Sequence, residues 1–242
     1  MKLILSKQMK WMSLGAFLVL TVSWAQGQPI NPNNTIALQN ISAIGAGAQN
    51  LGGTTMVTNR IGNVEGSVHL FESWSNTGIL DLGGDESKRY LIRNINYNIY
   101  RDAMESQVGK DSVFTFDNPN IERFYINSRE FKKYYFPRDA ASRYFEVIYE
   151  NSDFSLVRLY TLGLSEGSNN PMVNRPSKYV TNSEVYVRKG NSFKSARLKK
   201  STILELAGSK SKELDTFVKE NVLSYKKDFD VRQMLEAVLG KQ

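Results

Sequence analysis

The sequence GLSEG at residues 163–167 matches the GxSxG pattern of serine hydrolases. In those enzymes the serine, here Ser165, is a nucleophile on a sharp turn between a strand and a helix. A strand pattern precedes it at residues 154–162, but two asparagines and Pro171 follow where the helix should begin. The histidine base would lie downstream, whereas the single histidine of the chain, His69, lies far upstream. We therefore expect a turn here, without a nucleophile.

His69 is the second candidate for acid–base chemistry. It belongs to the pattern SVHLFES at residues 67–73, which predicts a β-strand. Glu72 could assist it only from the same face, and alternation along a strand places the two side chains on opposite faces. We therefore expect a half-exposed histidine on a strand. The sequence assigns no catalytic residue and no ligand-binding residue.

The sequence contains few of the residues and motifs that bind metals or cofactors. One histidine and no cysteine are too few ligands for tetrahedral zinc. Three carboxylates surround two glycines at residues 81–86, but their spacing is not that of a calcium loop, so we expect a hairpin turn. The glycines at residues 45–50 miss the dinucleotide pattern, and the SxxK match at residues 209–212 has no partner motif. The sequence predicts no metal and no cofactor.

Basic side chains gather around the last predicted hairpin: Arg188, Lys189, Lys194, Arg197, Lys199 and Lys200. Such a patch could contact an anionic surface or nucleic acid, but lysines also protect edge strands from aggregation, and we favour that interpretation. Tyr134, Tyr135 and Phe136, beside Lys132 and Lys133, could form an aromatic binding platform. Alternation along a strand would bury about half of these rings, so we expect them in the core.

The first 27 residues determine the expected compartment. Basic residues at positions 2, 7 and 10 precede an uncharged run at residues 11–25, and small residues follow at Ala25 and Gly27. This order is typical of a secretory signal peptide, with cleavage after Ala25 or Gly27. The run is shorter than the ~20 residues that span a bilayer, so we expect no transmembrane helix in the mature protein. The protein is expected in the periplasm, on the outer membrane or outside the cell.

Composition narrows the class of protein further. The chain has no cysteine, which excludes disulfides, thiolate chemistry and a lipid-modified cysteine. The formal net charge is +7, and the basic residues concentrate from Val185 onward. In an exported protein, such a region more often faces acidic envelope surfaces than nucleic acid. We therefore expect no nucleic-acid partner.

The chain divides into a signal peptide at residues 1–27, a low-order segment rich in Asn and Gly at residues 28–65, an antiparallel β domain at residues 66–198 and a helical region at residues 199–242. The predicted fold is mainly β, an antiparallel sandwich or barrel-like sheet, with two to three short C-terminal helices. The predicted strands cover residues 67–73, 78–82, 90–100, 103–108, 112–116, 121–127, 130–136, 143–150, 154–162, 184–189 and 192–198.

One long connection and three helices complete the prediction. Residues 165–183 contain two prolines and no periodicity, which indicates a long loop. Ser201 is expected to cap a helix that ends at Gly208. A second helix would bury Leu214 and Val218, together with Phe217. Asp230 is expected to cap a third, whose apolar face is Val231, Met234, Leu235, Val238 and Leu239.

Four stretches of this chain carry a resemblance to known proteins: SVHLFESW at residues 67–74, NINYN at residues 94–98, DSV at residues 111–113 and KKS at residues 199–201. Together they resemble uncharacterised exported proteins of Gram-negative envelopes, over residues 66–239. The resemblance implies the same β-rich fold and compartment, and it carries no known activity.

These observations favour an exported, non-enzymatic envelope protein that acts by binding or scaffolding, through an envelope protein, a glycan or a lipid surface. The first alternative is a hydrolase built on two carboxylates, since such enzymes need only a pair of acidic side chains at a set separation. The second is an outer-membrane barrel, for which the predicted strands are short and charged.

Overall fold

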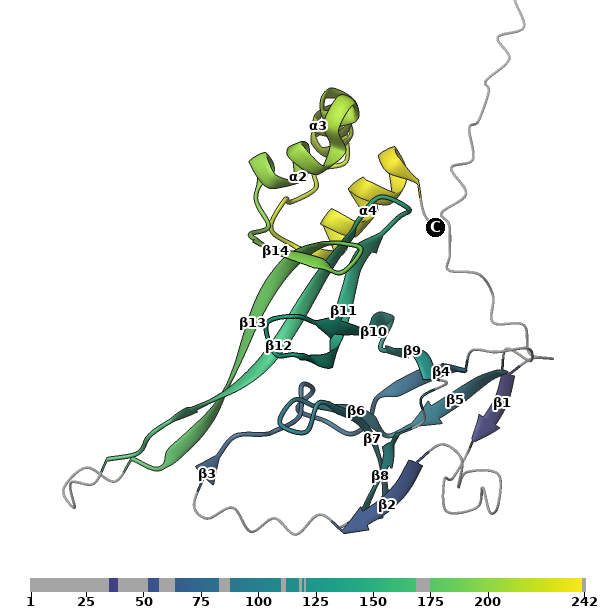
Figure 1. The fold of residues 1–242 in the computed structure, drawn as a ribbon, viewed down its shortest axis with the longest axis vertical. Coiled ribbons are helices and arrows are strands. Elements are labelled where there is room, and N and C mark those ends of the chain that lie inside the picture. The colour runs from purple at the N-terminus through teal and green to yellow at the C-terminus, as the bar shows by residue number, and fades with distance from the viewer. Residues whose placement is uncertain are drawn as a thin grey trace, which may run out of the picture. The chain divides into compact units, whose positions relative to one another are not determined.

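The computed structural model describes residues 35–38, 52–56, 64–82, 88–109, 112–117, 119, 121–168 and 175–240. The larger of two sheets in these residues has the strand order β1-β5-β4-β9-β10-β11-β12-β13-β14, with β3 paired to β13 (Figure 1). Its strands are β1 (Thr35–Leu38), β3 (Val64–Glu65), β4 (Thr77–Leu82), β5 (Lys88–Arg93), β9 (Ile121–Ile126), β10 (Arg129–Phe136), β11 (Ala141–Glu150), β12 (Ser155–Ser165), β13 (Ser177–Lys189) and β14 (Ser192–Ala196).

A smaller sheet lies against one part of the large sheet. Its order is β2 (Gly52–Met56), β8 (Ser112–Phe116), β7 (Ala103–Gly109) and β6 (Ile95–Asn98). Phe116 of the small sheet meets Phe124 of the large sheet with ring centroids 5.4 Å apart. The prediction of a mainly β fold with C-terminal helices is confirmed. Most pairings are antiparallel, but β1 pairs with β5, and β3 with β13, in parallel.

The single strand predicted at residues 90–100 is wrong, because the chain changes sheet in its middle. Residues up to Arg93 belong to β5 of the large sheet, and residues from Ile95 belong to β6 of the small one. Asn94 between them has a φ of 54°, in the left-handed region that asparagine tolerates better than most residues. The kink lets one apolar run serve both sheets.

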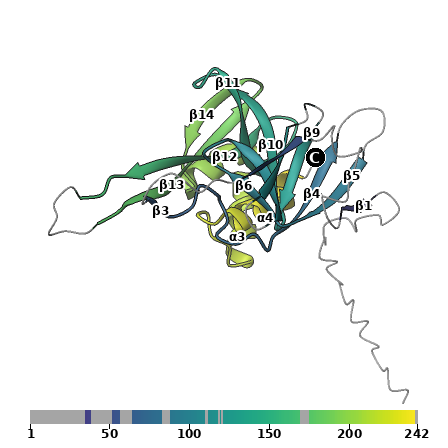
Figure 2. The same cartoon turned by 90° about the horizontal axis from the view of Figure 1, so that it is seen from below.

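The loop predicted at residues 165–183 is also wrong. Strands β12 and β13 pair from Ser155 with Arg188 out to Ser165 with Lys178, so they form one long hairpin. The described pairing of β11 to β12 ends at Leu159, and that of β14 to β13 ends at Val185. The outer part of the hairpin therefore extends beyond β11 and β14 (Figure 2), and the short strand β3 pairs with its outer end at Ser177 and Lys178. Cross-strand pairing forms this part of β13 even though its sequence shows no periodicity.

Three α-helices follow the sheet: α2 (Lys200–Ala207), α3 (Ser211–Glu220), joined to α2 by the 3₁₀ turn η3 (Gly208–Lys210), and α4 (Asp228–Leu239). Two expected caps are wrong. Helix α2 begins one residue before Ser201, with no side-chain cap, and Asp230 lies inside α4, where it accepts a bond from the Ser224 N–H at 2.9 Å. Gly208 ends α2 as expected, with a φ of 55°. No helix in the described residues is long and apolar enough to span a bilayer.

One face of the large sheet carries two apolar clusters with a polar band between them. Along β12, Tyr160 belongs to the cluster that the small sheet covers, and Leu156 to the cluster that the helices cover. Between them on the same face lies Arg158, which pairs in register with Glu146 of β11. The predicted apolar face of α4 is buried in the second cluster, on Ile148 and Leu156 of the sheet.

Candidate binding site at the curled end of the large sheet

The opposite face of the large sheet curls around an aromatic cluster. Phe193 on the edge strand β14 lies 5.1 Å between ring centroids from Phe136 on β10 and 5.1 Å from Phe145 on β11. Tyr186 on β13 packs edge-on against Phe136 at 5.4 Å. The sheet must curl to bring rings from strands β10 and β14 into contact, since three strands separate them in the sheet order. This curl creates the candidate site.

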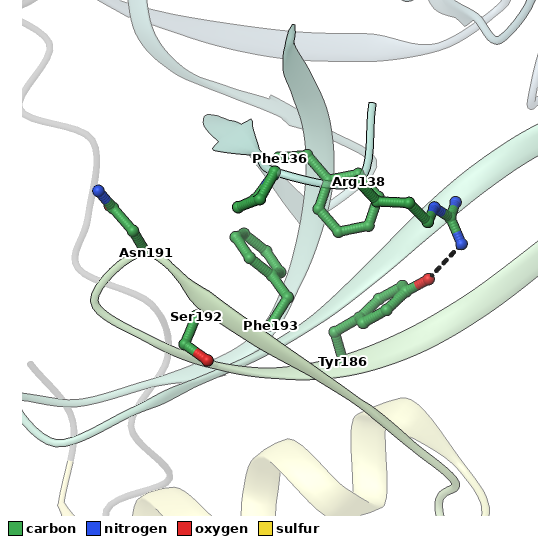
Figure 3. A pocket seen from close by; sticks show the side chains of 7 residues that line it. Phe136, Arg138, Tyr186, Asn191, Ser192 and Phe193 are labelled. Atoms are coloured by element: carbon green, nitrogen blue, oxygen red, sulfur yellow. Dashed lines mark hydrogen bonds between the residues drawn. The ribbon is translucent and has the colours of Figure 1, made fainter. Parts of the chain in front are cut away.

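Arg138, in the turn after β10, bridges the curl to β13. Its guanidinium lies over the Phe136 ring at 4.8 Å, and its Nη1 donates to Tyr186 Oη at 2.8 Å and to Glu184 Oε2 at 3.0 Å. The Tyr186 hydroxyl also donates to Glu184. Figure 3 shows Arg138 and Tyr186 facing each other, beside the Phe136 and Phe193 rings. This triad ties a turn to a strand almost fifty residues further along the chain.

The triad also fixes the charge state of its members. The bonds donated by Tyr186 and then by Arg138 hold the pKa of Glu184 below its ordinary value. Burial, with the adjacent Glu184 carboxylate, raises the pKa of the Tyr186 hydroxyl to about 12. At neutral pH, Tyr186 is therefore a protonated donor and Glu184 an ionised acceptor, an arrangement that stabilises the site rather than activating a nucleophile.

Two adjoining hollows open on the curl. The first, of about 600 Å³, lies between the ends of β10 and β14 and is lined by Phe136, Pro137, Arg138, Tyr186, Asn191, Ser192 and Phe193 (Figure 3). The second, of about 730 Å³, lies where β14 ends and the chain leaves for α2. Its lining holds four basic side chains (Arg138, Arg158, Arg197 and Lys226) and one acidic side chain, Glu184. We call this second hollow the basic groove.

The basic groove contains positive charge that the described protein does not neutralise. Arg138 is paired with Glu184, and Arg158 with Asp228 of helix α4. Within the described residues, Arg197 and Lys226 have neither an ion pair nor a side-chain hydrogen bond, and both are exposed. Two free cations beside hydroxyl groups, among them Ser195, suit an anionic ligand.

Only part of the basic cluster that the sequence predicts around the last hairpin lies at the basic groove. Arg188 lies over the Tyr134 ring at 4.1 Å, and Lys200 pairs with Asp215 of helix α3. Lys189, Lys194 and Lys199 are exposed around the β13–β14 hairpin. Since β14 ends the strand order, Lys194 does lie on an edge strand. Arg197 is the member of the cluster that lines the basic groove.

The predicted aromatic run is divided between core and surface, as alternation requires. Phe136 is buried and Tyr134 packs against its cluster, whereas Tyr135 is 53% exposed. Lys132 pairs with Glu150, and Lys133 lies over the Tyr144 ring at 5.1 Å. The run is therefore mainly core, as expected, but its last ring forms part of the first hollow.

His69 does not belong to a strand of seven residues, so that prediction is wrong. It makes an isolated bridge to Asn98, and its Nε2 lies 2.9 Å from Glu105 Oε2. Glu105 is 1% exposed and also accepts bonds from Asn98 Nδ2 at 3.1 Å. Burial would raise the pKa of Glu105, but the bonds from His69 and Asn98 outweigh it and lower that pKa. Glu72 is exposed, and the carboxylate that contacts His69 is that of Glu105.

The other motifs do not assemble into a site. Ser165 is the last residue of β12 rather than part of a turn, so the turn prediction is wrong, and it pairs with Lys178. The SxxK match spans η3 and the first turn of α3. The glycines at residues 45–50 and most of residues 81–86 lie outside the described residues, as does the predicted signal peptide at residues 1–27. In the described residues no three His, Asp or Glu side chains are grouped to hold a metal ion.

The two carboxylates of the polar band, Glu146 and Asp228, are each paired with an arginine. Glu146 is 3% exposed and accepts two bonds from Arg129, each 2.8 Å long, and one from Tyr160 at 2.7 Å. Burial opposes these bonds, but they lower the pKa of Glu146. Glu146 therefore joins β11 to Arg129 of β10 and to Tyr160 of β12 within the sheet. Asp228, the first residue of α4, pairs with Arg158 of β12 and so joins the helix to the sheet.

No family model, curated protein or solved structure matches this chain. No motif in the sequence marks Arg138, Glu184, Tyr186 or Phe193 as members of a site. The dipeptide Gly190-Asn191 is the one local signal near the site, because it is typical of a two-residue hairpin turn. Phe193 follows this turn, on the strand that ends the sheet order.

Proposed function

We propose that this protein is an exported, non-enzymatic component of the cell envelope that binds an anionic partner through the basic groove. The observation that carries the proposal is the pair of unneutralised cations, Arg197 and Lys226, at the open end of a stabilised aromatic curl. Exposed charges draw an oppositely charged partner into contact and set the rate of association. Export is supported by the basic, apolar and small residues in order at positions 1–27.

The curl supplies a rigid base for such binding. Phe193 and Tyr186 are held by ring contacts, and Arg138 by two hydrogen bonds, so the groove is formed before any ligand arrives. Binding to a pre-formed site avoids the free-energy cost of ordering side chains.

Two measurements test the proposal. In the native host, fractionation with mass spectrometry should find the protein outside the cytoplasm with a new N-terminus at Gln26 or Gln28. An intact Met1 in the folded protein would contradict export.

The second measurement uses immobilised mature protein and an extract of the host envelope. A retained component should be released by salt, and the double variant Arg197→Gln/Lys226→Gln should retain at least tenfold less of it. The matched control is Lys189→Gln/Lys212→Gln, which removes two exposed charges away from the groove. Equal retention by both double variants would contradict the role of the groove.

A further inference from the structure

Strand β14 has one edge that no described strand covers. It pairs with β13 through residues Ser192 to Ala196, and it ends the strand order of the large sheet. On β10, across the first hollow, residues from Lys133 onward have no β9 partner, because the described pairing of β9 to β10 stops at Lys132. The first hollow thus lies between two free strand edges, with the aromatic cluster as its floor (Figure 3).

The hairpin turn fixes which backbone groups of β14 point outward. Gly190 has a φ of 56°, which suits the first central residue of a type II′ turn. In such a turn the N–H of Ser192 bonds to the C=O of Lys189. Hydrogen-bonded pairs alternate along an antiparallel ladder, so Lys194 and Ala196 also bond to β13. The backbone N–H and C=O of Phe193 and Ser195 therefore point away from β13, toward the free edge.

The rings at this site are poor surfaces for stacking a sugar. Phe136 is 2% exposed and Tyr186 is 5% exposed, because their faces are covered by one another and by Phe193. What remains accessible is a strand edge with unpaired amides, cations at Lys194 and Arg197, and the apolar border of Phe193. An extended polypeptide matches these features, since it offers backbone partners along its whole length.

We propose that β14 binds an acidic peptide segment as an added β-strand, with alternate side chains toward the aromatic floor and toward the cations. This inference rests on the proposed function and names its partner class: a polypeptide with acidic and apolar residues in alternation. Main-chain bonds to Phe193 and Ser195 hold the segment, and its carboxylates approach Lys194, on the face opposite Phe193. Arg197, just after the end of β14, adds positive charge at the end of the segment, and neither cation has a described ion pair.

The test uses a fluorescein-labelled peptide of ten residues that alternates glutamate and valine, with binding followed by fluorescence anisotropy. The key variant is Ser195→Pro, which removes an outward N–H. Proline is tolerated on an edge strand where its missing N–H faces solvent, so the β13–β14 ladder should persist. The matched control is Ser195→Ala, which also lacks the hydroxyl but keeps the N–H, and we expect Ser195→Pro to bind the peptide at least tenfold more weakly than Ser195→Ala.

Variants of the peptide keep the protein unchanged and so remove any doubt about folding. Methylation of alternate backbone nitrogens should abolish binding, and replacing each glutamate by lysine should weaken it at least tenfold. Unchanged binding of the methylated peptide would overturn strand addition. If binding of the methylated peptide is still weakened by Arg197→Gln/Lys226→Gln, the basic groove does bind anions. The proposed function then stands, and only the inference of strand addition is wrong.

Two further outcomes also overturn the inference. One is the absence of measurable binding of the glutamate–valine peptide to the original protein. The other is self-association of the protein that Ser195→Pro abolishes, since the occupant of the edge would then be a second copy of this chain.

Discussion

Arg158 on β12 joins the large sheet to helix α4 through Asp228. Its Nη2 donates to Asp228 Oδ1, and its Nη1 donates to Ser183 Oγ on β13 at 3.1 Å. The Asp228 side chain is 33% exposed and that of Arg158 is 17% exposed, so water screens the pair only in part. Because these two residues lie in the polar band between the apolar clusters, their contact sets where the helix meets the sheet.

A double-mutant cycle measures that contact. We expect Arg158→Met, Asp228→Asn and the double variant to give a coupling free energy of about 1 kcal/mol in denaturant unfolding. Lys219 and Asp215 provide the control pair: they lie four residues apart on α3, and the Lys219 side chain is 70% exposed. Their coupling should be smaller. Equal coupling in the two pairs would show that Arg158 does not anchor the helix.

The local sequence predicts whether a segment is a strand or a helix better than it predicts where a strand ends or which sheet it joins. Strand and helix patterns identified a mainly β chain with C-terminal helices, because side-chain periodicity is a local property. Asn94 shows the limit, since a kink at one residue sends a continuous apolar run into two sheets. The outer part of β13 shows another: it is a strand because β12 pairs with it.

The candidate site could not be read from the sequence because its members meet only in the folded chain. Arg138 and Glu184 lie in different hairpins, and no local pattern pairs a turn residue with a strand residue so far along the chain. Phe193 is an ordinary strand residue until the sheet curls over Phe136 and Phe145. The basic cluster around the last hairpin can be recognised in the sequence. In the fold, however, Lys200 is paired with Asp215 and Arg188 lies over the Tyr134 ring, so these two cations are already engaged within the protein.

The two carboxylates of the polar band should respond to pH in opposite directions. The pKa of Glu146 is lowered in the folded protein, so its contribution to stability is present above the unfolded pKa, near 4.5, and is lost as pH falls through the folded value. Burial raises the pKa of Asp228 more than Arg158 lowers it, so this group favours folding at low pH and loses that contribution as pH rises.

The variant Glu146→Gln tests the first of these effects. Removing one partner of a fully buried pair costs ~3–5 kcal/mol, but the Arg129 side chain is 31% exposed and can regain water. We therefore expect a loss of about 2 kcal/mol at pH 7, shrinking as pH falls below 4.5. Urea unfolding between pH 3 and pH 7 measures it. A loss of stability that is constant over this range would contradict the assigned pKa shift.

Gly78 is required by close packing between the two sheets. A Cβ there would lie 2.5 Å from the Tyr125 carbonyl oxygen and 2.8 Å from Ile95 Cγ2. We expect Gly78→Ala to cost about 2 kcal/mol or more, as overpacking usually does. Gly109→Ala is the matched control, because among the described residues its Cβ would meet only Ser112, at 3.6 Å. Thermal unfolding that is equal for the two variants would show that the sheets separate readily at Gly78.

The apolar face of α4 should stabilise the β domain as a whole. Leu235 is fully buried in the cluster that α4 shares with Ile148 and Leu156 of the sheet, so Leu235→Ala should lower the free energy of unfolding by ~2–5 kcal/mol in a single cooperative transition. Phe229, on the same helix but 73% exposed, is the control, and Phe229→Ala should change stability by less than ~0.5 kcal/mol. A separate early transition for the helices, with an unchanged sheet, would show that α4 folds independently. Its docking could then regulate the basic groove, because Lys226 of the groove lies two residues before the start of α4.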